Sequence, residues 1–410
     1  MHDAILERPW RHDARAATLV GLAHMTSHFF QMLLPPIYPL LMHDFGIGYT
    51  EAGFLATVFF SISSTGQALA GFVVDRFGAF RVLLLGLALL VAAGLMLGLA
   101  NSYAQLVATA ALAGAGNAMF HPADFTILNR RVSAARLGHA FAMHGLSGNL
   151  GWAAGAAFMA AVSALLGWHA AGVCAAGVAL LALLFLLTQG AVLDGGMVSA
   201  PPPAPALPSQ DVAARPGQFA FLRSPTVWLC FAFFLLATGA GGILQNFAPA
   251  MLSHVYGVTL ALGTMGLTAY LLGSACGTVL GGFVAGRDAR SARVVALSLC
   301  LAAGVSLALA SAQLPVLLLL PAMVILGIGW GTASPSRDLL IRQAATAQFG
   351  ADSFGRVYGF VYAGLDSGLA MGPLLVGPLL DRGFFRSGLL CIALLQIGAV
   401  VVALGVGRRV

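Results

Sequence analysis

Continuous runs of apolar residues, separated by short charged or turn-forming stretches, set the pattern along the 410-residue chain. Because the runs are unbroken rather than alternating, they predict helices and not half-buried strands. About twenty apolar residues in a helix cross a membrane core of about 30 Å, where backbone groups must be satisfied within the chain. The pattern therefore predicts an all-α membrane protein with twelve transmembrane helices, at residues 16–42, 52–74, 80–100, 104–128, 138–164, 168–190, 226–252, 259–285, 292–312, 314–338, 356–380 and 387–407.

A segment rich in proline, alanine and serine, LDGGMVSAPPPAPALPSQDVAARPGQ, separates the sixth predicted span from the seventh. This composition favours an extended connection over a packed element. It divides the chain into an N-terminal six-helix half, 1–190, a cytoplasmic linker, 191–225, and a C-terminal six-helix half, 226–410.

The two halves also resemble each other in sequence. GQALAGFVVDRF at 66–77 aligns with GTVLGGFVAGRD at 277–288, at the end of the second span of each half. Two related six-helix halves predict a pseudo-symmetric bundle with a site between them near the membrane midplane, and rocking of one half against the other.

Composition supports a membrane location, since 59% of the residues are hydrophobic and only 8% are charged, whereas soluble domains carry about a quarter charged residues. With the N-terminus in the cytoplasm, the arginines of the loops fall inside, and only Arg382 and Arg386 fall outside. This asymmetry predicts a multi-pass protein of the bacterial inner membrane with both termini cytoplasmic. The net charge of +6 is thereby explained by orientation, and no nucleic-acid partner is expected. The N-terminus has no small-residue cleavage signal, so the first span is expected to be retained.

The loop after the second predicted span, GFVVDRFGAFR, reads G-x-x-x-D-R-x-G-x-x-R. It resembles the signature loop of the major facilitator superfamily, and the degenerate copy in the second half agrees with that resemblance. The resemblance implies the twelve-helix fold of that family and a latch that holds one conformation shut on the cytoplasmic side. Gly71 would let two helices approach closely. The plainer interpretation is a charged loop that sets topology. The implied gating residues are Gly71, Asp75, Arg76, Gly78 and Arg81.

Three stretches of the N-terminal half, HMTSHFFQMLLPPIYPLL, FHPADFTILNRR and GLSGNLGWAAGA, are similar to the fosmidomycin-resistance type of efflux protein. That group shows a His followed four residues later by Asp in the first span. Here His24 matches the His, whereas His28 replaces the Asp. The prolines that follow, Pro35, Pro36 and Pro39, are expected to bend the outer half of this span rather than end it.

Ionisable residues accumulate within the predicted spans, where charged side chains are costly and tend to be functional. His24, His121 and His144 each fall about 6 to 8 Å to the cytoplasmic side of their span centres, by the helical rise per residue. Their rings are therefore expected to share one layer. The residues of this layer that are expected to bind substrate or protons are His24, His28, His121, Asp124 and His144.

Three interpretations of the histidine layer stay open. Each ring could be a neutral core residue bonded to a backbone carbonyl or to a hydroxyl of a neighbouring helix. A histidine beside a carboxylate could instead carry a coupling proton, because its charge changes near physiological pH. Two imidazoles at i,i+4 with a third ring and a carboxylate could also hold a divalent transition ion. The expectation is no metal and no cofactor, with the proton gradient as the energy source.

Four further polar residues are expected to take part in substrate or proton binding. Arg337, at the inner end of the tenth span, could reach an anionic substrate or snorkel to the membrane surface. Asp366 in the eleventh span is a candidate for proton exchange, because an unpaired charge is costly there. Gln245 and Asn246 in the seventh span could bond a ligand or a neighbouring helix.

Glycines recur every three or four residues in the fifth span, at Gly148, Gly151 and Gly155. Small residues at this spacing let helix backbones approach closely in a membrane. The fifth span is therefore expected to pack tightly against a neighbour.

Together these features favour a secondary active transporter that exports a small organic molecule, a drug or a metabolite, by alternating access in exchange for protons. The alternatives are an importer of an organic anion or a metal complex, and a non-transporting membrane receptor or scaffold. An enzyme is not expected, because the sequence has neither a Walker A motif nor H-E-x-x-H. The expected partners are the small-molecule substrate and the lipid bilayer, and the protein is expected to be a monomer.

Overall fold

The computed structural model describes residues 10–133, 136–194, 220–285, 291–349 and 354–409, and no strand occurs among them. The elements are α1 (Trp10–Gln31), η1 (Pro35–Ile37), α2 (Tyr38–Phe45), α3 (Tyr49–Phe77), α4 (Ala79–Gly98), α5 (Tyr103–Asn117), α6 (Phe120–Arg131), α7 (Leu137–Leu166), α8 (Trp168–Leu187), α9 (Gly190–Leu193), η3 (Ala220–Arg223), α10 (Pro225–Tyr256), α11 (Leu260–Ala285), α12 (Ser291–Ala310), η4 (Val316–Leu318), α13 (Leu319–Phe349), α14 (Phe354–Asp381) and α15 (Phe385–Gly407).

Within the described residues, nine helices are long and apolar enough to cross a membrane, and the bent helix α3 makes a tenth when it is taken as one span. The first and fourth predicted spans are each divided into two helices, α1 with α2 and α5 with α6. The all-α membrane fold expected from the hydrophobic pattern is thus confirmed.

The first span is interrupted where its prolines lie. The helix α1 ends at Gln31, a 3₁₀ turn covers Pro35–Ile37, and α2 begins at Tyr38. Proline has no N–H, and its ring clashes with the carbonyl group four residues earlier, so two adjacent prolines remove successive helical hydrogen bonds. The expectation that these prolines only bend the span was wrong, because the α-helix ends before them.

The fourth span is interrupted between Asn117 at the end of α5 and Phe120 at the start of α6. The end of α5 meets the end of α1, where Gln31 Nε2 donates to Asn117 Oδ1 at 3.1 Å. Broken helices are tolerated in a membrane only where protein groups or a cavity surround the break. The two breaks therefore mark a polar region in the middle of the bundle.

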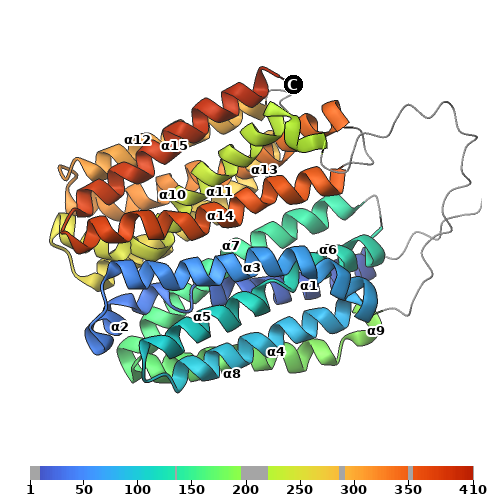
Figure 1. Ribbon diagram of the computed structural model, residues 1–410, viewed down its shortest axis with the longest axis horizontal. Helices are drawn as coiled ribbons and strands as arrows, with labels where there is room; N and C mark the ends of the chain where they lie inside the picture. Colours follow the sequence, from blue (N-terminus) through green and yellow to red (C-terminus); the bar gives the residue numbers. More distant parts are fainter. Residues whose placement is uncertain (1–9, 134–135, 195–219, 286–290, 350–353, 410) are drawn as a thin grey trace, which may run out of the picture.

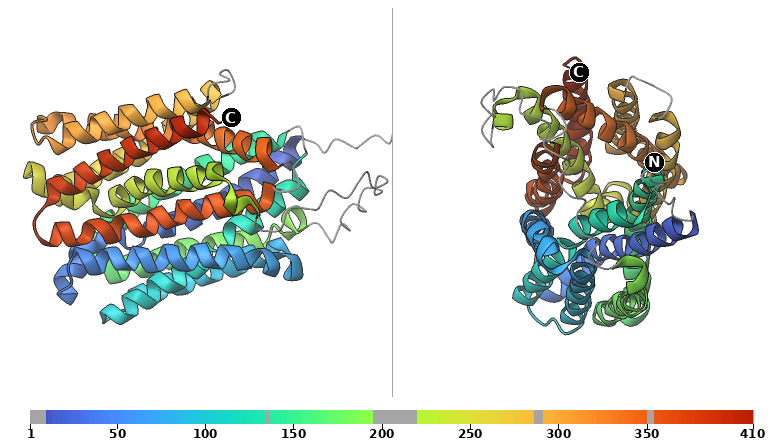
Figure 2. Two further views of the ribbon diagram at one scale, coloured as in Figure 1. Left: turned by 45° about the horizontal axis from the view of Figure 1, so that its top comes forward. Right: turned by 90° about the vertical axis from the view of Figure 1, so that its right-hand side faces the viewer.

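The helices form two groups that lie side by side, α1 to α9 and α10 to α15 (Figure 1). The start of α1, the helix α9 and the C-terminus lie at one end of the bundle, which we call the linker end (Figures 1 and 2). The helix α2 and the turn between α14 and α15 lie at the opposite end (Figure 1). Most of the predicted linker, 191–225, lies outside the described residues, as does part of the repeated motif, 286–288.

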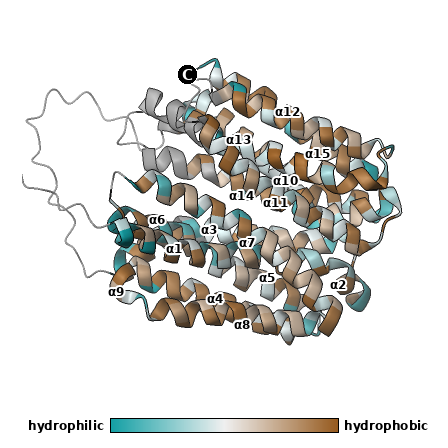
Figure 3. Cartoon of the chain, turned by 180° about the vertical axis from the view of Figure 1, so that it is seen from behind, coloured by the Kyte–Doolittle hydropathy of each residue, from teal (hydrophilic) through white to brown (hydrophobic). Residues whose placement is uncertain are grey.

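Hydrophobic residues make up much of the helices of both groups (Figure 3), and many of their large side chains are exposed. Exposed examples are Leu181 on α8, Leu297 on α12 and Leu394 on α15. Hydrophilic residues gather at the linker end around α1 and α6 (Figure 3). This distribution fits a bundle that is surrounded by lipid along its sides and meets water at its ends.

At the linker end, Asp13 of α1 holds the chain that leads into α7. Its Oδ2 accepts hydrogen bonds from the Ser133 N–H at 3.2 Å and from Arg136 Nε at 2.9 Å. Burial acts to raise the pKa of Asp13, but the bonds from Ser133 and Arg136 outweigh it and hold the pKa below its usual value. The charged carboxylate therefore joins α1 to α7 at this end.

The two groups are joined at the opposite end through Asp381, the last residue of α14. Its Oδ1 accepts from the Tyr49 N–H at 2.6 Å, and its Oδ2 accepts from the Thr50 N–H at 3.0 Å. First-turn amides of a helix have no acceptor within that helix, and a negative charge there is favourable. Asp381 therefore caps α3, a helix of the other group.

Replacing Asp381 with Asn is expected to loosen this contact, because an amide has one acceptor atom where a carboxylate has two charged ones. Hydrogen bonds to a charged group contribute about 1.5 to 3 kcal/mol. The fraction of molecules in which the contact between α3 and α14 is open is therefore expected to rise about tenfold or more. The measurement is the rate of maleimide labelling at Thr57→Cys, in a background without the native cysteines. Thr57 of α3 contacts the Ala370 carbonyl of α14.

The matched control for this experiment is Asp44→Asn. Asp44 lies at the same end, but its bond from Trp168 Nε1 stays within one group of helices. Labelling at position 57 should not change in this control. An unchanged labelling rate in Asp381→Asn would show that the cap does not hold the two groups together.

Candidate functional site: a histidine cluster beside a central cavity

The candidate site depends on close packing of α1 against α7. A Cβ atom added at Gly151 would collide with the carbonyl oxygen of Met25. One added at Gly148 would lie 2.8 Å from Cε1 of both His24 and His28. The expected tight packing of the glycine-rich span is confirmed, and its neighbour is α1.

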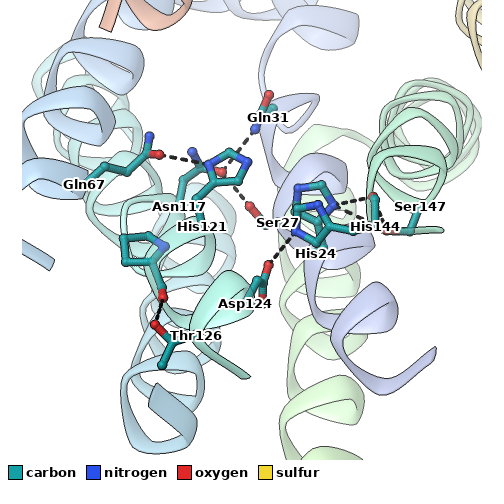
Figure 4. Close-up of polar contacts among 11 residues, drawn as sticks. His24, Ser27, Gln31, Gln67, Asn117, His121, Asp124, Thr126, His144 and Ser147 are labelled. Atoms are coloured by element: carbon teal, nitrogen blue, oxygen red, sulfur yellow. Dashed lines mark hydrogen bonds and ion pairs between the residues drawn. The ribbon is translucent and has the colours of Figure 1, made fainter. Parts of the chain in front are cut away.

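Four imidazole rings form a cluster beside these glycines, which we call the histidine cluster. The His24 ring stacks on the His144 ring at a centroid distance of 3.5 Å. It lies 4.3 Å from the His28 ring and 5.4 Å from the His121 ring. Figure 4 shows how residues of α1, α6 and α7 converge here. The expectation that these rings share one layer is confirmed.

Asp124 of α6 lies at the edge of the histidine cluster. Its Oδ2 lies 3.1 Å from His144 Nε2, and both side chains are buried. Its other oxygen, Oδ1, is buried and has no hydrogen-bond partner among the described residues. The i,i+3 spacing between His121 and Asp124 places both side chains on the face of α6 that meets the cluster.

Hydrogen bonds decide which ring nitrogens of the neutral histidines carry a proton. A carbonyl oxygen only accepts, so His24 Nδ1, which lies 2.9 Å from the backbone oxygen of His144, donates. His121 Nδ1 donates to Gln67 Oε1 at 2.9 Å. The Gln67 amide is oriented by its Nε2, which donates to Asp366 Oδ2 at 2.8 Å. The Nε2 atoms of His24 and His121 therefore present lone pairs.

A chain of side-chain hydrogen bonds runs from the end of α1 to α14. Gln31 Nε2 donates to Asn117 Oδ1 at 3.1 Å, and Asn117 Nδ2 donates to Ser63 Oγ at 2.7 Å. Ser63 Oγ also accepts from Gln67 Nε2 at 3.2 Å. Because Gln67 also bonds Asp366, this chain crosses from one group of helices to the other.

A small cavity lies between the two groups where α1 ends. Gln31 and Tyr38 line it from one group, and Gln245 and Asn246 of α10 line it from the other. Tyr38 OH donates to Asn246 Oδ1 at 2.9 Å, whereas the buried Gln245 Oε1 has no partner among the described residues. Phenylalanines, leucines and alanines make up most of the remaining wall. Apolar side chains with a few amide groups suit a small polar or amphipathic ligand.

Arg337, which was expected to help bind a substrate, is not among the described residues that line this cavity. Its guanidinium lies 4.9 Å from the centre of the Phe234 ring, in a cation–π contact between α13 and α10. Of the residues expected in the C-terminal half, the structure thus brings Gln245 and Asn246 to the cavity and Asp366 to the hydrogen-bonded chain.

The signature loop lies at the linker end, between α3 and α4. Gly78 has φ +89°, which favours glycine, so the turn itself requires this residue. Asp75, Arg76 and Arg81 are exposed. A Cβ atom added at Gly71 would meet no described atom within 4 Å, so the close helix approach expected there is not present in this structure.

The sequence did not single out the neutral polar residues whose hydrogen bonds connect the helices around the cavity and the histidine cluster. They occur as single polar side chains within apolar runs, which is the one signal that could have revealed them. These residues are Ser27, Gln31, Tyr38, Ser63, Gln67 and Asn117.

The fold and the signature loop agree with a match to the family model of the Major Facilitator Superfamily, which covers residues 20–373. The chain belongs to this superfamily. Crystal structures of a bacterial homologue of the human lysosomal transporter Spinster, in inward-facing unoccupied and occupied conformations, match with TM-scores of 0.77 and 0.74. Each match is 15% identical and covers 98% of both chains. At this identity the likeness shows the fold.

Two curated relatives match this facilitator in sequence. The fosmidomycin resistance protein of Escherichia coli (strain K12) is 29% identical over 145 residues, 35% of this chain and 36% of that protein. The uncharacterized MFS-type transporter YfnC of Bacillus subtilis (strain 168) is 27% identical over 169 residues, 41% of each chain. Both matches thus span less than half of the relative. The family match and the fold agree with the expectation of a transporter and not an enzyme.

The contact between α1 and α7 predicts a difference between two glycines of one helix. Gly151→Ala is expected to lower the stability of the facilitator by about 1 to 3 kcal/mol, because the added methyl group meets the Met25 backbone and overpacks the contact. The measurement is the melting temperature of the purified protein in detergent.

The matched control is Gly145→Ala, on the same helix. A Cβ atom there meets no described atom within 4 Å, so this change should be neutral or slightly stabilising. Equal melting temperatures for the two variants would contradict the role assigned to the glycine contact.

Proposed function

We propose that this facilitator is a secondary active transporter that exports a small organic molecule across the bacterial inner membrane, by alternating access and in exchange for protons. The observation that carries the proposal is the hydrogen-bonded chain between the cavity and Asp366. Gln31 belongs both to the cavity wall and to this chain. A ligand at one end and a proton at the other can therefore influence each other through a continuous set of contacts.

The cavity is proposed as the substrate site. Its amide groups come from both groups of helices, and the bond from Tyr38 to Asn246 joins the two groups directly. A ligand that takes over this bond changes the contacts between the groups. Differential contacts of this kind are what allow a ligand to shift a conformational equilibrium.

Asp366 is proposed to carry the coupling proton. An ionised carboxylate at membrane depth is costly unless it is paired. Among the side chains that the structure describes, Asp366 forms no ion pair, and it accepts its bond from Gln67 of α3. Protonation removes the charge that strengthens this bond. The contact between α3 and α14 would thereby depend on whether the proton is bound.

The proposed orientation places the linker end in the cytoplasm. The arginine-rich loops predict this orientation, and the signature loop with Asp75, Arg76 and Arg81 would then act as a cytoplasmic latch. The name of the Escherichia coli relative favours export over import. We further propose that the protein works as a monomer, because each part of the proposed path lies within one chain.

Asp366→Asn is expected to uncouple transport, since asparagine keeps an acceptor for Gln67 but takes up no proton. Resistance of cells to small antimicrobials, beginning with fosmidomycin, identifies a transported molecule. Its movement is then measured in proteoliposomes with and without a pH difference. One pH unit is worth about 1.4 kcal/mol per proton, or about tenfold in the accumulation ratio. The wild type should show this response and Asp366→Asn should not.

Asp44→Asn serves as the control, because Asp44 lies at the end of the bundle and outside the proposed path. It should respond to the pH difference as the wild type does. Wild-type transport that is indifferent to pH in both directions would refute proton coupling. A full pH response in Asp366→Asn would assign the proton to another group.

A further inference from the structure

Three rings of the histidine cluster, those of His24, His28 and His121, each place a nitrogen within 4.8 Å of the others. We propose that these rings bind a divalent first-row transition ion, with Zn²⁺ and Co²⁺ as the probes. This metal site is separate from the proposed transport function. There the coupling proton is carried by Asp366, which is not one of the three ligands. All three ligands come from α1 and α6, within one group of helices.

The hydrogen bonds around two of the rings are those of metal ligands. A histidine that binds a metal usually donates its other N–H to a carbonyl or carboxylate oxygen, which fixes the ring and frees the ligating lone pair. His24 Nδ1 donates to the backbone oxygen of His144, and His121 Nδ1 donates to Gln67 Oε1. Both rings therefore offer Nε2 as a ligand.

The nitrogens at the centre of the site have no other partner. His24 Nε2 and both nitrogens of His28 are buried and lack a hydrogen bond among the described residues. A buried polar atom without a partner is unfavourable, and lone pairs that face each other add to that penalty. A cation that accepts the lone pairs of His24 Nε2 and of one His28 nitrogen lowers this penalty, because neutral imidazole has one lone-pair nitrogen and one N–H.

The three ring nitrogens are close enough to coordinate one ion after a small movement of the side chains. Zinc binds imidazole nitrogen at about 2.0 to 2.1 Å, so two nitrogens on a tetrahedral ion lie about 3.4 Å apart. The nitrogens here lie at most 4.8 Å apart, and rotation about χ2 of the His28 ring, which has no hydrogen bond among the described residues, can close part of the difference. Gly148 and the Trp152 ring, 4.6 Å from the His28 ring, hold the rings in place from the side of α7.

The donor set selects the class of ion. Three imidazole nitrogens suit Zn²⁺, Co²⁺, Ni²⁺ or Cu²⁺, whereas Mg²⁺ and Ca²⁺ require a shell of oxygen ligands. Asp124 Oδ1 is also buried without a partner, and Asp124 forms a second group of the same spacing with His24 and His144. The Asp124 carboxyl group stands beside the site and offers an oxygen atom as a further ligand.

The test is a titration of the full-length, tag-free protein with Co²⁺ in detergent. The wild type is expected to show the visible absorption bands of nitrogen-bound, low-coordinate Co²⁺, to saturate at one ion per chain and to lose the bands when Zn²⁺ is added. Zn²⁺ should also raise the melting temperature by mass action.

His28→Gln removes a ligand, and neither ring nitrogen of His28 has a hydrogen-bond partner among the described residues that the substitution would break. It is expected to weaken Co²⁺ binding by about 100-fold or more, at least as much as the loss of an outer-shell partner. His121→Asn is the second variant if His28→Gln does not fold. The control is His43→Gln, because the His43 side chain is 86% exposed on α2 at the opposite end.

Wild-type protein without Co²⁺ bands would overturn the proposal. So would a titration of His28→Gln and His121→Asn that matches the wild type, or binding that disappears in His43→Gln. The assay measures no transport, so its result is independent of the coupling experiment on Asp366. If the protein binds Co²⁺ but transports without regard to pH, the metal site stands and the proposed coupling is refuted. If it transports in response to pH but binds no Co²⁺, the coupling stands and the metal site is refuted.

Discussion

The structure depends on one contact, the approach of α7 to α1 across glycines. Side chains at Gly148 or Gly151 would occupy the space that the α1 backbone and the rings of His24 and His28 now fill. With the two helices this close, His24 stacks on His144 and bonds its backbone oxygen. The partners that polar groups need in a membrane interior are therefore supplied by neighbouring helices rather than by water.

The interrupted helices extend this principle to the centre of the bundle. Prolines end α1 just after Gln31, and α5 ends at Asn117, so two amide side chains meet where regular helical bonding stops. Their hydrogen bonds continue through Ser63 and Gln67 to the other group of helices. The same interruptions leave the cavity that Gln31 shares with residues of α10. The local loss of helix thus creates both the cavity and its connections.

The pair α3 and α14 joins the two groups by two carboxylates in different surroundings. Asp381 binds first-turn amides of α3 at the end of the bundle, where a fixed negative charge is favoured by the helix terminus. Asp366 accepts its bond from Gln67 at membrane depth, where charge is costly. One contact is therefore suited to holding the groups together, and the other is suited to sensing a proton.

The amino-acid sequence alone is enough to establish the all-α membrane fold, because long apolar runs are stable only as helices in lipid. It also indicated the histidine layer, since i,i+3 and i,i+4 spacing and similar depth follow from helix geometry. It did not reveal that α1 ends before Pro35, that Arg337 lies over Phe234, or that Gln31, Gln67 and Asn117 connect the cavity to Asp366. Those outcomes depend on which helix faces meet and on how closely they approach. They can be read only from the packed helices, because each polar residue in an apolar run has several possible neighbours until the packing selects one.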